Sequence, residues 1–148
     1  MDHDASDGLV EASADAVLLI VAALTQTELT ALAMGARSRG LDVLCEVHDE
    51  AELQRAMDAG CDLIGVNTRD LRTFKVDPQT AFRLAERLPK NVVRVAESGI
   101  RSGEDIARLH EAGYQAFLIG ETLMRAVLPG EALRELVASA EFRVPSGR

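Results

Sequence analysis

Short apolar runs alternate with longer amphipathic stretches along most of the chain. Runs that are almost continuously apolar and rich in β-branched residues lie at 16–21, 42–47, 63–67, 92–97 and 116–120. Such runs are typical of parallel strands covered on both faces. The stretches at 27–39, 49–59, 78–88, 102–112 and 129–140 carry Leu or Ala at three- and four-residue steps with charged residues opposite, and a shorter one lies at 123–127. This spacing predicts amphipathic helices.

The positions of glycine and proline residues support the same alternation of strands and helices. Gly40, Gly60 and Gly113 each follow a helical stretch and precede a strand, which is the usual place of a helix C-cap. Pro129 stands at a permitted first-turn position of the last helix. The sequence therefore predicts an α/β fold of about five βα units with right-handed crossovers, so all strands are parallel. Either an open flavodoxin-like sheet or part of a (β/α)₈ barrel of TIM type fits this alternation, and periodicity does not separate them.

Composition narrows the classes of protein. The chain has 148 residues, of which 47% are hydrophobic and 27% charged, so we expect residues 1–148 to form a single globular domain with an irregular or disordered segment at 1–8. The net charge of −8 disfavours a nucleic-acid partner. The N-terminus is acidic, unlike a signal peptide, and the apolar run 16–24 is about half the length that spans a bilayer. We therefore expect no membrane partner and a cytoplasmic location.

The two cysteines of the sequence, Cys45 and Cys61, lie in or beside apolar runs. In a reducing compartment such residues are usually free, buried thiols, and this is the state we expect for both. Metal binding would need further ligands at suitable spacing, and the three histidines do not supply them. The sequence predicts no metal site.

Polar side chains end three consecutive predicted strands. Glu46, Asn67 and Glu97 stand at or just before the carboxyl ends of apolar runs. A carboxylate inside such a run is costly to bury without a partner, and a helix cap or an ion pair with Arg could explain one of them. Three polar residues at the ends of neighbouring parallel strands indicate a functional site, because catalytic residues of barrel enzymes stand at the carboxyl ends of the strands. Two carboxylates in a partly apolar pocket suit proton transfer.

The loops after the last two strands have a different character. Ser98-Gly99 follows one strand and Gly120-Glu121-Thr122 follows the next. Glycine directly after a strand lets the backbone approach a ligand, and the N–H groups that open the following helix attract anions. Loops at the seventh and eighth strands of barrels commonly hold phosphate in this way. The presence of glycine in both loops therefore favours a phosphate-binding site over the alternative that the glycines only form turns.

The longest loop between a predicted strand and its helix covers 68–76. It contains Arg69, Leu71 and Phe74. Solvated charge is the simplest explanation of its composition. The alternative is a loop that covers a substrate, with Leu71 or Phe74 as an apolar wall and Arg69 in a salt bridge.

At these residues the sequence resembles the indole-3-glycerol phosphate synthase family. The resemblance rests on LDVLCEVHDEAEL, LIGVNTRDLRTFKVD, VAESGI and AFLIGETLMRA, in that order and spacing, and on ADAVLLI, which is similar to the family's fourth strand. It extends from about Leu9 to Val137. It implies a (β/α)₈ barrel of tryptophan biosynthesis that closes the indole ring of 1-(2-carboxyphenylamino)-1-deoxyribulose 5-phosphate with loss of CO₂ and water, using no metal or organic cofactor.

The resemblance also implies roles for individual residues. Glu46 would be the catalytic carboxylate of strand five, Asn67 the strand-six amide that positions substrate, and Glu97 the strand-seven carboxylate. The phosphate pocket would be lined by Ser98, Gly99, Gly120 and Glu121, the last of which is often serine in the family. Arg69 and Leu71 would flank the anthranilate ring.

One departure from the family is large. Aligned in this way, the sequence starts at the helix before strand four, so the strands that carry the family's general-acid lysine, a second lysine and another glutamate are not matched. The two lysines of this sequence, Lys75 and Lys90, do not stand at strand ends on the catalytic rim. We expect the chain to associate with itself or with a chain that supplies the missing strands. Whether it catalyses alone is left open, and a non-catalytic phosphate-binding half-barrel and a flavodoxin-like binding module are the alternatives.

Overall fold

The computed structural model describes residues 13–140 and shows five parallel strands joined by helices. The segment 1–8, for which the sequence predicts irregular structure, lies outside the described residues. The strands are β1 (Ala16–Ile20), β2 (Asp42–Val47), β3 (Leu63–Asn67), β4 (Val93–Glu97) and β5 (Ala116–Leu118). They form one sheet in the order β1-β2-β3-β4-β5, and every neighbouring pair is parallel. The predicted α/β fold with an all-parallel sheet is confirmed.

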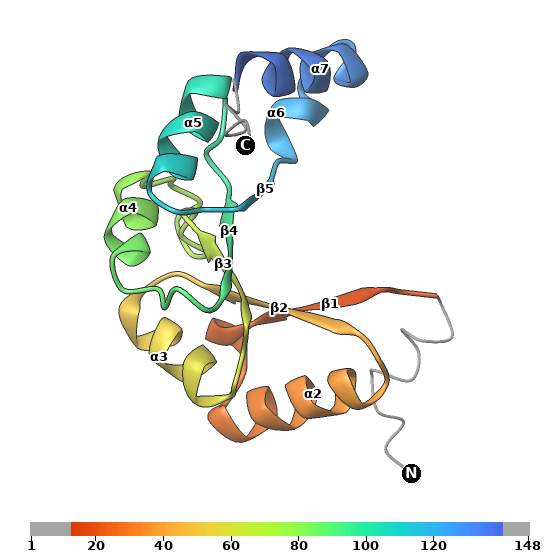
Figure 1. The fold of residues 1–148 in the computed structure, drawn as a ribbon, viewed down its shortest axis with the longest axis vertical. Helices are drawn as coiled ribbons and strands as arrows, with labels where there is room; N and C mark the ends of the chain where they lie inside the picture. The colour runs from red at the N-terminus through yellow and green to blue at the C-terminus, as the bar shows by residue number, and fades with distance from the viewer. Residues whose placement is uncertain (1–12, 141–148) are drawn as a thin grey trace, which may run out of the picture.

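The helices lie on one side of this curved sheet, and the other side carries no helix (Figure 1). They are the 3₁₀ turn η1 (Val21–Ala23) and the helices α2 (Gln26–Ser38), α3 (Glu50–Asp58), α4 (Gln79–Ala85), α5 (Gly103–Glu111), α6 (Glu121–Met124) and α7 (Pro129–Ser139). Strand order equal to chain order, with helices on the outer side only, is the arrangement of a barrel segment. A flavodoxin-like sheet has helices on both faces and a reversal of strand order. The structure is therefore a partial barrel of TIM type.

Local signals in the sequence set the helix ends. Thr25 and Ser102 each form a capping box with the acidic residue three positions later, and the Asp49 side chain accepts a hydrogen bond from the N–H of Glu52. The glycines after α2, α3 and α5 all have positive φ, as the predicted C-caps require. These ends fall within one or two residues of the predicted ones.

Three predicted elements are shorter or shifted. Helix α4 ends at Ala85 instead of residue 88, and Pro89 disfavours a helical conformation at the residue before it. Strand β5 ends at Leu118 instead of residue 120, since it pairs only with three residues of β4 and forms an edge of the described sheet. Helix α6 covers 121–124 instead of 123–127, because the Gly120 carbonyl already accepts from the Met124 N–H.

Alternate residues of each strand face the helices or the bare side. The side chains of Val43, Cys45 and Val47 on β2 and of Ile64 and Val66 on β3 are buried in the core against the helices. On the bare side, Leu18, Leu44, Leu63 and Val93 stand at matching register positions across four strands. Leu18 and Val93, at the two ends of this row, are 44% and 45% exposed. The bare side therefore presents apolar surface that the described residues do not cover.

The expectation of free thiols is wrong for this structure. The Sγ atoms of Cys45 and Cys61 are bonded to each other, with their Cα atoms 6.4 Å apart. The pairing could not be predicted from the sequence, because the two residues are 16 positions apart and belong to different parts of the fold. They meet only when the turn after α3 packs against β2.

No helix among residues 13–140 is both long and apolar enough to cross a bilayer.

Candidate active site

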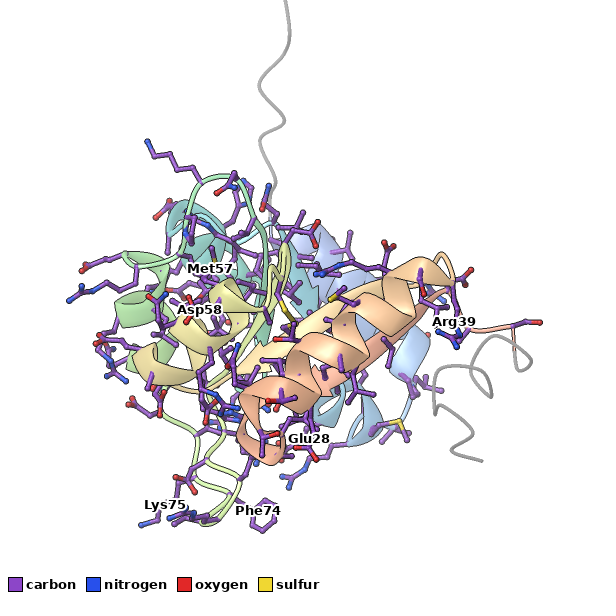
Figure 2. All side chains as sticks on the ribbon, turned by 90° about the horizontal axis from the view of Figure 1, so that it is seen from below. Glu28, Arg39, Met57, Asp58, Phe74 and Lys75 are labelled. Carbon is purple, nitrogen blue, oxygen red and sulfur yellow. A yellow bond between two sulfur atoms is a disulfide. The ribbon has the colours of Figure 1, made fainter. Side chains whose placement is uncertain are left out.

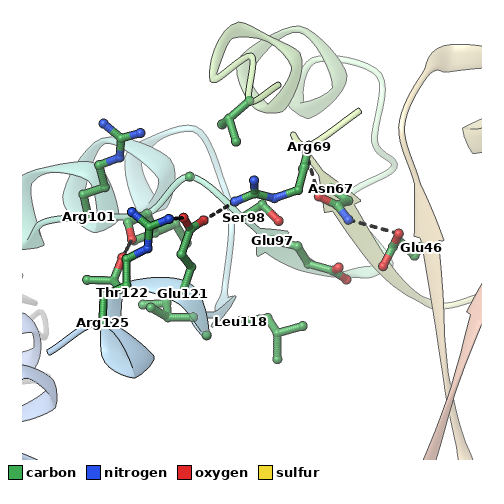
Figure 3. Close-up of a pocket in the computed structure, with 15 residues that line it drawn as sticks. Glu46, Asn67, Arg69, Glu97, Ser98, Arg101, Leu118, Glu121, Thr122 and Arg125 are labelled. Atoms are coloured by element: carbon green, nitrogen blue, oxygen red, sulfur yellow. Dashed lines mark hydrogen bonds and ion pairs between the residues drawn. The ribbon is translucent and has the colours of Figure 1, made fainter. Parts of the chain in front are cut away.

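The three polar residues at the strand ends lie together on the bare side of the sheet. Glu46 and Glu97 are 5% and 3% exposed, and Asn67 stands directly opposite Glu97 in the ladder. Asn67 Nδ2 donates a hydrogen bond of 3.0 Å to Glu46 Oε1 (Figure 3). Asn67 Oδ1 accepts from the backbone N–H of Arg69 at 3.0 Å, which fixes the orientation of the amide. Parallel strands in register bring these residues together, as the sequence predicted.

A glycine makes room for the Glu97 carboxyl group. Gly65 lies on β3 beside Glu46 and Val95 in the ladder, on the same face as Asn67. A Cβ atom at Gly65 would lie 1.9 Å from Glu97 Oε1 and 2.9 Å from its carboxyl carbon. Real Cβ atoms do not come so close to other atoms. The buried Glu97 carboxyl therefore occupies the space that any side chain at position 65 would need.

The Glu46 carboxyl group and burial both affect the protonation of Glu97. Burial, a hydrogen bond with Glu46 and repulsion from the Glu46 charge together raise the pKa of Glu97 to about 8. The Glu97 Oε1 atom is buried, and without a proton between the two carboxyls it has no hydrogen-bond partner. At neutral pH Glu97 is thus mostly protonated. A buried carboxylic acid beside a second carboxyl group can donate or accept a proton near neutral pH.

The backbone after β4 is held in an uncommon conformation. Ser98 and Gly99 have φ values of 62° and 72°, and for the non-glycine Ser98 this left-handed region costs energy. The Thr68 hydroxyl donates to the carbonyl oxygen of Glu97 or Ser98, at 3.3 and 3.2 Å, and supports the turn. A Cβ at Gly99 would lie 2.7 Å from Val76 Cγ1, so both the conformation and the space require glycine there.

A network of ion pairs closes the other end of the site. Glu121, at the start of α6, pairs with Arg69 from the loop after β3 and, at 2.9 Å, with Arg125 (Figure 3). The Thr122 hydroxyl donates to the Ile100 carbonyl at 2.6 Å. Arg69 thus forms a salt bridge with Glu121, which comes from the loop after β5.

These residues surround an open cavity of about 720 Å³. It is lined by Glu46, Asn67, Arg69, Val76, Glu97, Ser98, Gly99, Ile100, Arg101, Leu118, Ile119, Gly120, Glu121, Thr122 and Arg125. The lining runs from the carboxyl pair at one end to the glycine turns and arginines at the other. It joins a group suited to proton transfer with a group suited to an anion.

One residue that the sequence assigned to the site is not in the cavity wall. Leu71 is 42% exposed and lies outside the lining. The loop that carries it is closed by a bridge between Arg69 and Val76 and projects from the body of the molecule, with Phe74 and Lys75 at its tip (Figure 2). Neither Lys75 nor Lys90 lines the cavity.

The sequence reasoning missed two arginines. Arg101 and Arg125 line the cavity beside the glycine turns. Their positions, two residues after Gly99 and five after Gly120, are a signal that could have been used, because cations close to such turns strengthen anion binding. Among residues 13–140 no group of three or more His, Cys, Asp or Glu side chains is arranged to hold a metal ion.

Comparison with known sequences shows the family. The family model for indole-3-glycerol phosphate synthase matches residues 7–136 of this chain. The chain belongs to the indole-3-glycerol phosphate synthase family. It is 62% identical over 124 residues to the indole-3-glycerol phosphate synthase of Koribacter versatilis and 51% identical over 124 residues to that of Magnetococcus marinus. Each match covers 84% of this chain and 48% or 46% of the relative, so the chain spans about half the length of these curated relatives.

Solved structures support the fold alone. The chain superposes on 3-hexulose-6-phosphate synthase from Salmonella typhimurium with a TM-score of 0.77 at 18% identity, covering 94% of this chain and 68% of that one. It superposes on thiamine phosphate pyrophosphorylase from Pyrococcus furiosus with a TM-score of 0.72 at 19% identity, covering 93% and 65%.

Proposed function

We propose that this chain supplies the carboxyl-pair and phosphate side of an indole-3-glycerol phosphate synthase active site. In the reaction, the indole ring of 1-(2-carboxyphenylamino)-1-deoxyribulose 5-phosphate closes with loss of CO₂ and water. The observation that carries the proposal is the convergence of Glu46, Asn67 and Glu97 at one end of a cavity whose other end carries the glycine turns and arginines. A substrate with a reacting carbon skeleton and a terminal phosphate matches such a two-ended site.

The carboxyl end is assigned the chemistry. Glu46 and Glu97 are assigned proton transfer, since the raised pKa keeps Glu97 mostly protonated near neutral pH beside a second carboxyl group. Asn67 orients Glu46 through its amide hydrogen bond and can reach a substrate hydroxyl from the same position. No metal or organic cofactor is part of the proposal.

The opposite end is assigned to the phosphate. Ser98, Gly99, Gly120 and Thr122 present backbone and hydroxyl groups, and Arg101 and Arg125 supply positive charge at the same end. Glu121 forms ion pairs with Arg69 and Arg125 at the edge of this end of the cavity. Arg69 and, after a movement of its loop, Leu71 are proposed to flank the anthranilate ring.

The remaining barrel strands are proposed to come from further polypeptide, either joined to this chain or in a second chain. The two outer strands of the described sheet, β1 and β5, each have one unpaired edge. Large apolar side chains are exposed on the strands and after the last of them: Leu18, Val93 and Leu118 in the sheet, and Met124, Val127 and Leu128 in and after α6. We propose that residues 1–148 form one incomplete barrel domain that associates through this surface. A compact monomer in multi-angle light scattering would contradict self-association.

We further propose a cytoplasmic location, where this biosynthetic chemistry would be performed. The disulfide between Cys45 and Cys61 is uncommon in a reducing compartment. Cell fractionation tests the location. The protein is expected in the cytosolic fraction, and its recovery from another compartment would contradict this part of the proposal.

A non-catalytic role in phosphate binding is the second candidate. The observation that favours it is that no lysine lines the cavity, although ring closure needs a general acid to neutralise the developing alkoxide. In that case the chain would bind phosphorylated ligands and perform no chemistry even with the complementary strands present.

A chimera separates the two functions. The N-terminal half of the Koribacter versatilis relative is fused to this chain, and product formation is followed by indole fluorescence. Turnover is expected, and Glu46→Gln and Glu97→Gln should lower kcat by about 10²–10⁴-fold with a smaller effect on KM. A folded chimera that binds substrate and forms no product would refute catalysis and leave the binding role.

A further inference from the structure

His48 lies beside the carboxyl pair, and the proposed reaction has no role for it. It follows Glu46 by two residues, directly after β2 ends at Val47. Its Nε2 atom lies 3.3 Å from Glu46 Oε1 and is buried without a hydrogen-bond partner. The imidazole therefore faces a proposed catalytic carboxyl with an unsatisfied ring nitrogen.

Glu52 on α3 determines which nitrogen of the ring carries a proton. Its Oε2 atom accepts a hydrogen bond of 2.8 Å from the backbone N–H of His48 and lies 3.0 Å from His48 Nδ1. A carboxylate can only accept, so the proton of this contact resides on Nδ1. Both side chains are mostly buried, at 15% and 17% exposure, which holds the ring in place.

A ring protonated at Nδ1 presents a lone pair at Nε2 unless that nitrogen is protonated as well. At 3.3 Å from Glu46 Oε1, a lone pair would face a carboxylate oxygen, and two acceptors repel each other. One proton between Nε2 and Oε1 converts this repulsion into a hydrogen bond. The other polar neighbours of Glu46 are Asn67, which donates to Oε1, and Glu97, whose carboxyl group is itself short of a partner.

We propose that Glu52 and His48 are positioning residues that hold a proton at Glu46 Oε1. The proposal rests on the proposed function, in which Glu46 transfers protons. The single proton shared by His48 Nε2 and Glu46 Oε1 is the one that Glu46 gives to a bound molecule. Nε2 and Oε1 then face each other as two acceptors, which favours the return of a proton to this contact, while the imidazole keeps its Nδ1 proton on Glu52. No bond other than N–H and O–H is made or broken, and the proton returns from solvent or product at the end of the cycle.

The first test measures the tautomer and does not depend on catalysis. The ¹⁵N chemical shifts of the His48 ring are recorded by NMR in the 148-residue chain across neutral pH. We expect Nδ1 to be protonated throughout. In Glu52→Ala the ring should lose this preference, whereas Glu50→Ala, the same change at an exposed position in the same helical turn, should keep it. A ring protonated only at Nε2 in the unmodified chain would overturn the proposal.

The second test measures turnover in the chimera described above. Glu52→Ala and His48→Gln are each expected to lower kcat by about tenfold, the smaller end of the effect seen when partners that orient a histidine are removed, with KM nearly unchanged. The pH–rate profile of each variant should also shift relative to that of Glu50→Ala. Equal kcat and equal profiles for Glu52→Ala and Glu50→Ala would overturn the role.

Failure of the two proposals can be told apart. A chimera that is inactive without any substitution refutes the proposed function, and the tautomer measurement still decides the geometry of the Glu52–His48 pair. An active chimera with the wrong tautomer, or with unaffected variants, refutes only the part assigned to Glu52 and His48. Amide spectra of each variant show whether it is folded. The tautomer measurement on the unmodified chain needs no substitution, so it decides the proposal even if a variant does not fold.

Discussion

Replacing Gly65 by alanine should disturb both the stability and the chemistry of the site. The added methyl carbon would lie 1.9 Å from Glu97 Oε1, 2.9 Å from its carboxyl carbon and 3.2 Å from Leu44 Cδ1. The Leu44 contact can relax by a few tenths of an ångström. The Glu97 contact cannot, so the carboxyl group must leave its position and move toward the open cavity.

The expected change in the free energy of unfolding of Gly65→Ala follows from two opposing effects. Forcing an extra methyl group into packed space costs about 1–3 kcal/mol. Replacing glycine by alanine where the backbone is not left-handed recovers about 0.4–1 kcal/mol, because the unfolded chain loses freedom. We expect Gly65→Ala to lower the free energy of unfolding by about 1–2 kcal/mol. We also expect the pKa of Glu97 to fall from about 8 toward its ordinary value, since its carboxyl group becomes more solvated.

Urea unfolding and a ¹³C carboxyl titration measure the two quantities. Gly130→Ala is the matched control, because the nearest neighbour of a Cβ there is a flexible Arg134 side-chain atom at 3.8 Å. The double variant Gly65→Ala/Glu97→Ala removes the clash and should recover part of the loss, with a coupling of about 0.5–3 kcal/mol. Full stability and an unchanged Glu97 titration in Gly65→Ala would show that the Glu97 carboxyl group does not occupy the space beside Gly65, as would strictly additive effects in the double variant.

Other predictions concern charge and the disulfide. Glu97 binds its proton more tightly in the folded than in the unfolded chain, so stability should fall as pH rises from about 4.5 toward 8, by at most about 1.4 kcal/mol per pH unit. Glu97→Gln should flatten this slope in urea unfolding measured across that range, and an equal slope would contradict the raised pKa. Reducing the bond between Cys45 and Cys61 should lower stability by about 2–4 kcal/mol, since it closes a loop of 16 positions; unfolding with and without dithiothreitol measures this, and an unchanged midpoint would count against the bond. Glu121→Gln should change stability by less than about 1 kcal/mol because its ion pairs are exposed. It should tighten inorganic phosphate binding in calorimetry by removing a negative charge, and weaker binding would show that Glu121 helps to hold the anion.

The helices and strands, the direction of the strands and the polar residues at their ends could all be predicted from the sequence. Continuous apolar runs flanked by glycine caps predict parallel strands because the local backbone preferences and the two-sided burial agree. Parallel direction then brings Glu46, Asn67 and Glu97 to the same edge, whatever the exact curvature of the sheet. The motifs around these residues also carried the resemblance that the family comparison confirms.

The contacts between side chains could not be predicted from the sequence and become visible in the folded chain. The pairing of Cys45 with Cys61, the Glu97 carboxyl in the space beside Gly65 and the salt bridge from Arg69 to Glu121 join residues between 16 and 52 positions apart. Leu71 shows the converse, because it belongs to the same loop as Arg69 and yet lies outside the cavity. Residue spacing encodes local conformation, whereas such contacts depend on strand register and on the packing of helices against the sheet. These are set by the burial of the whole core, which no single segment of the sequence specifies.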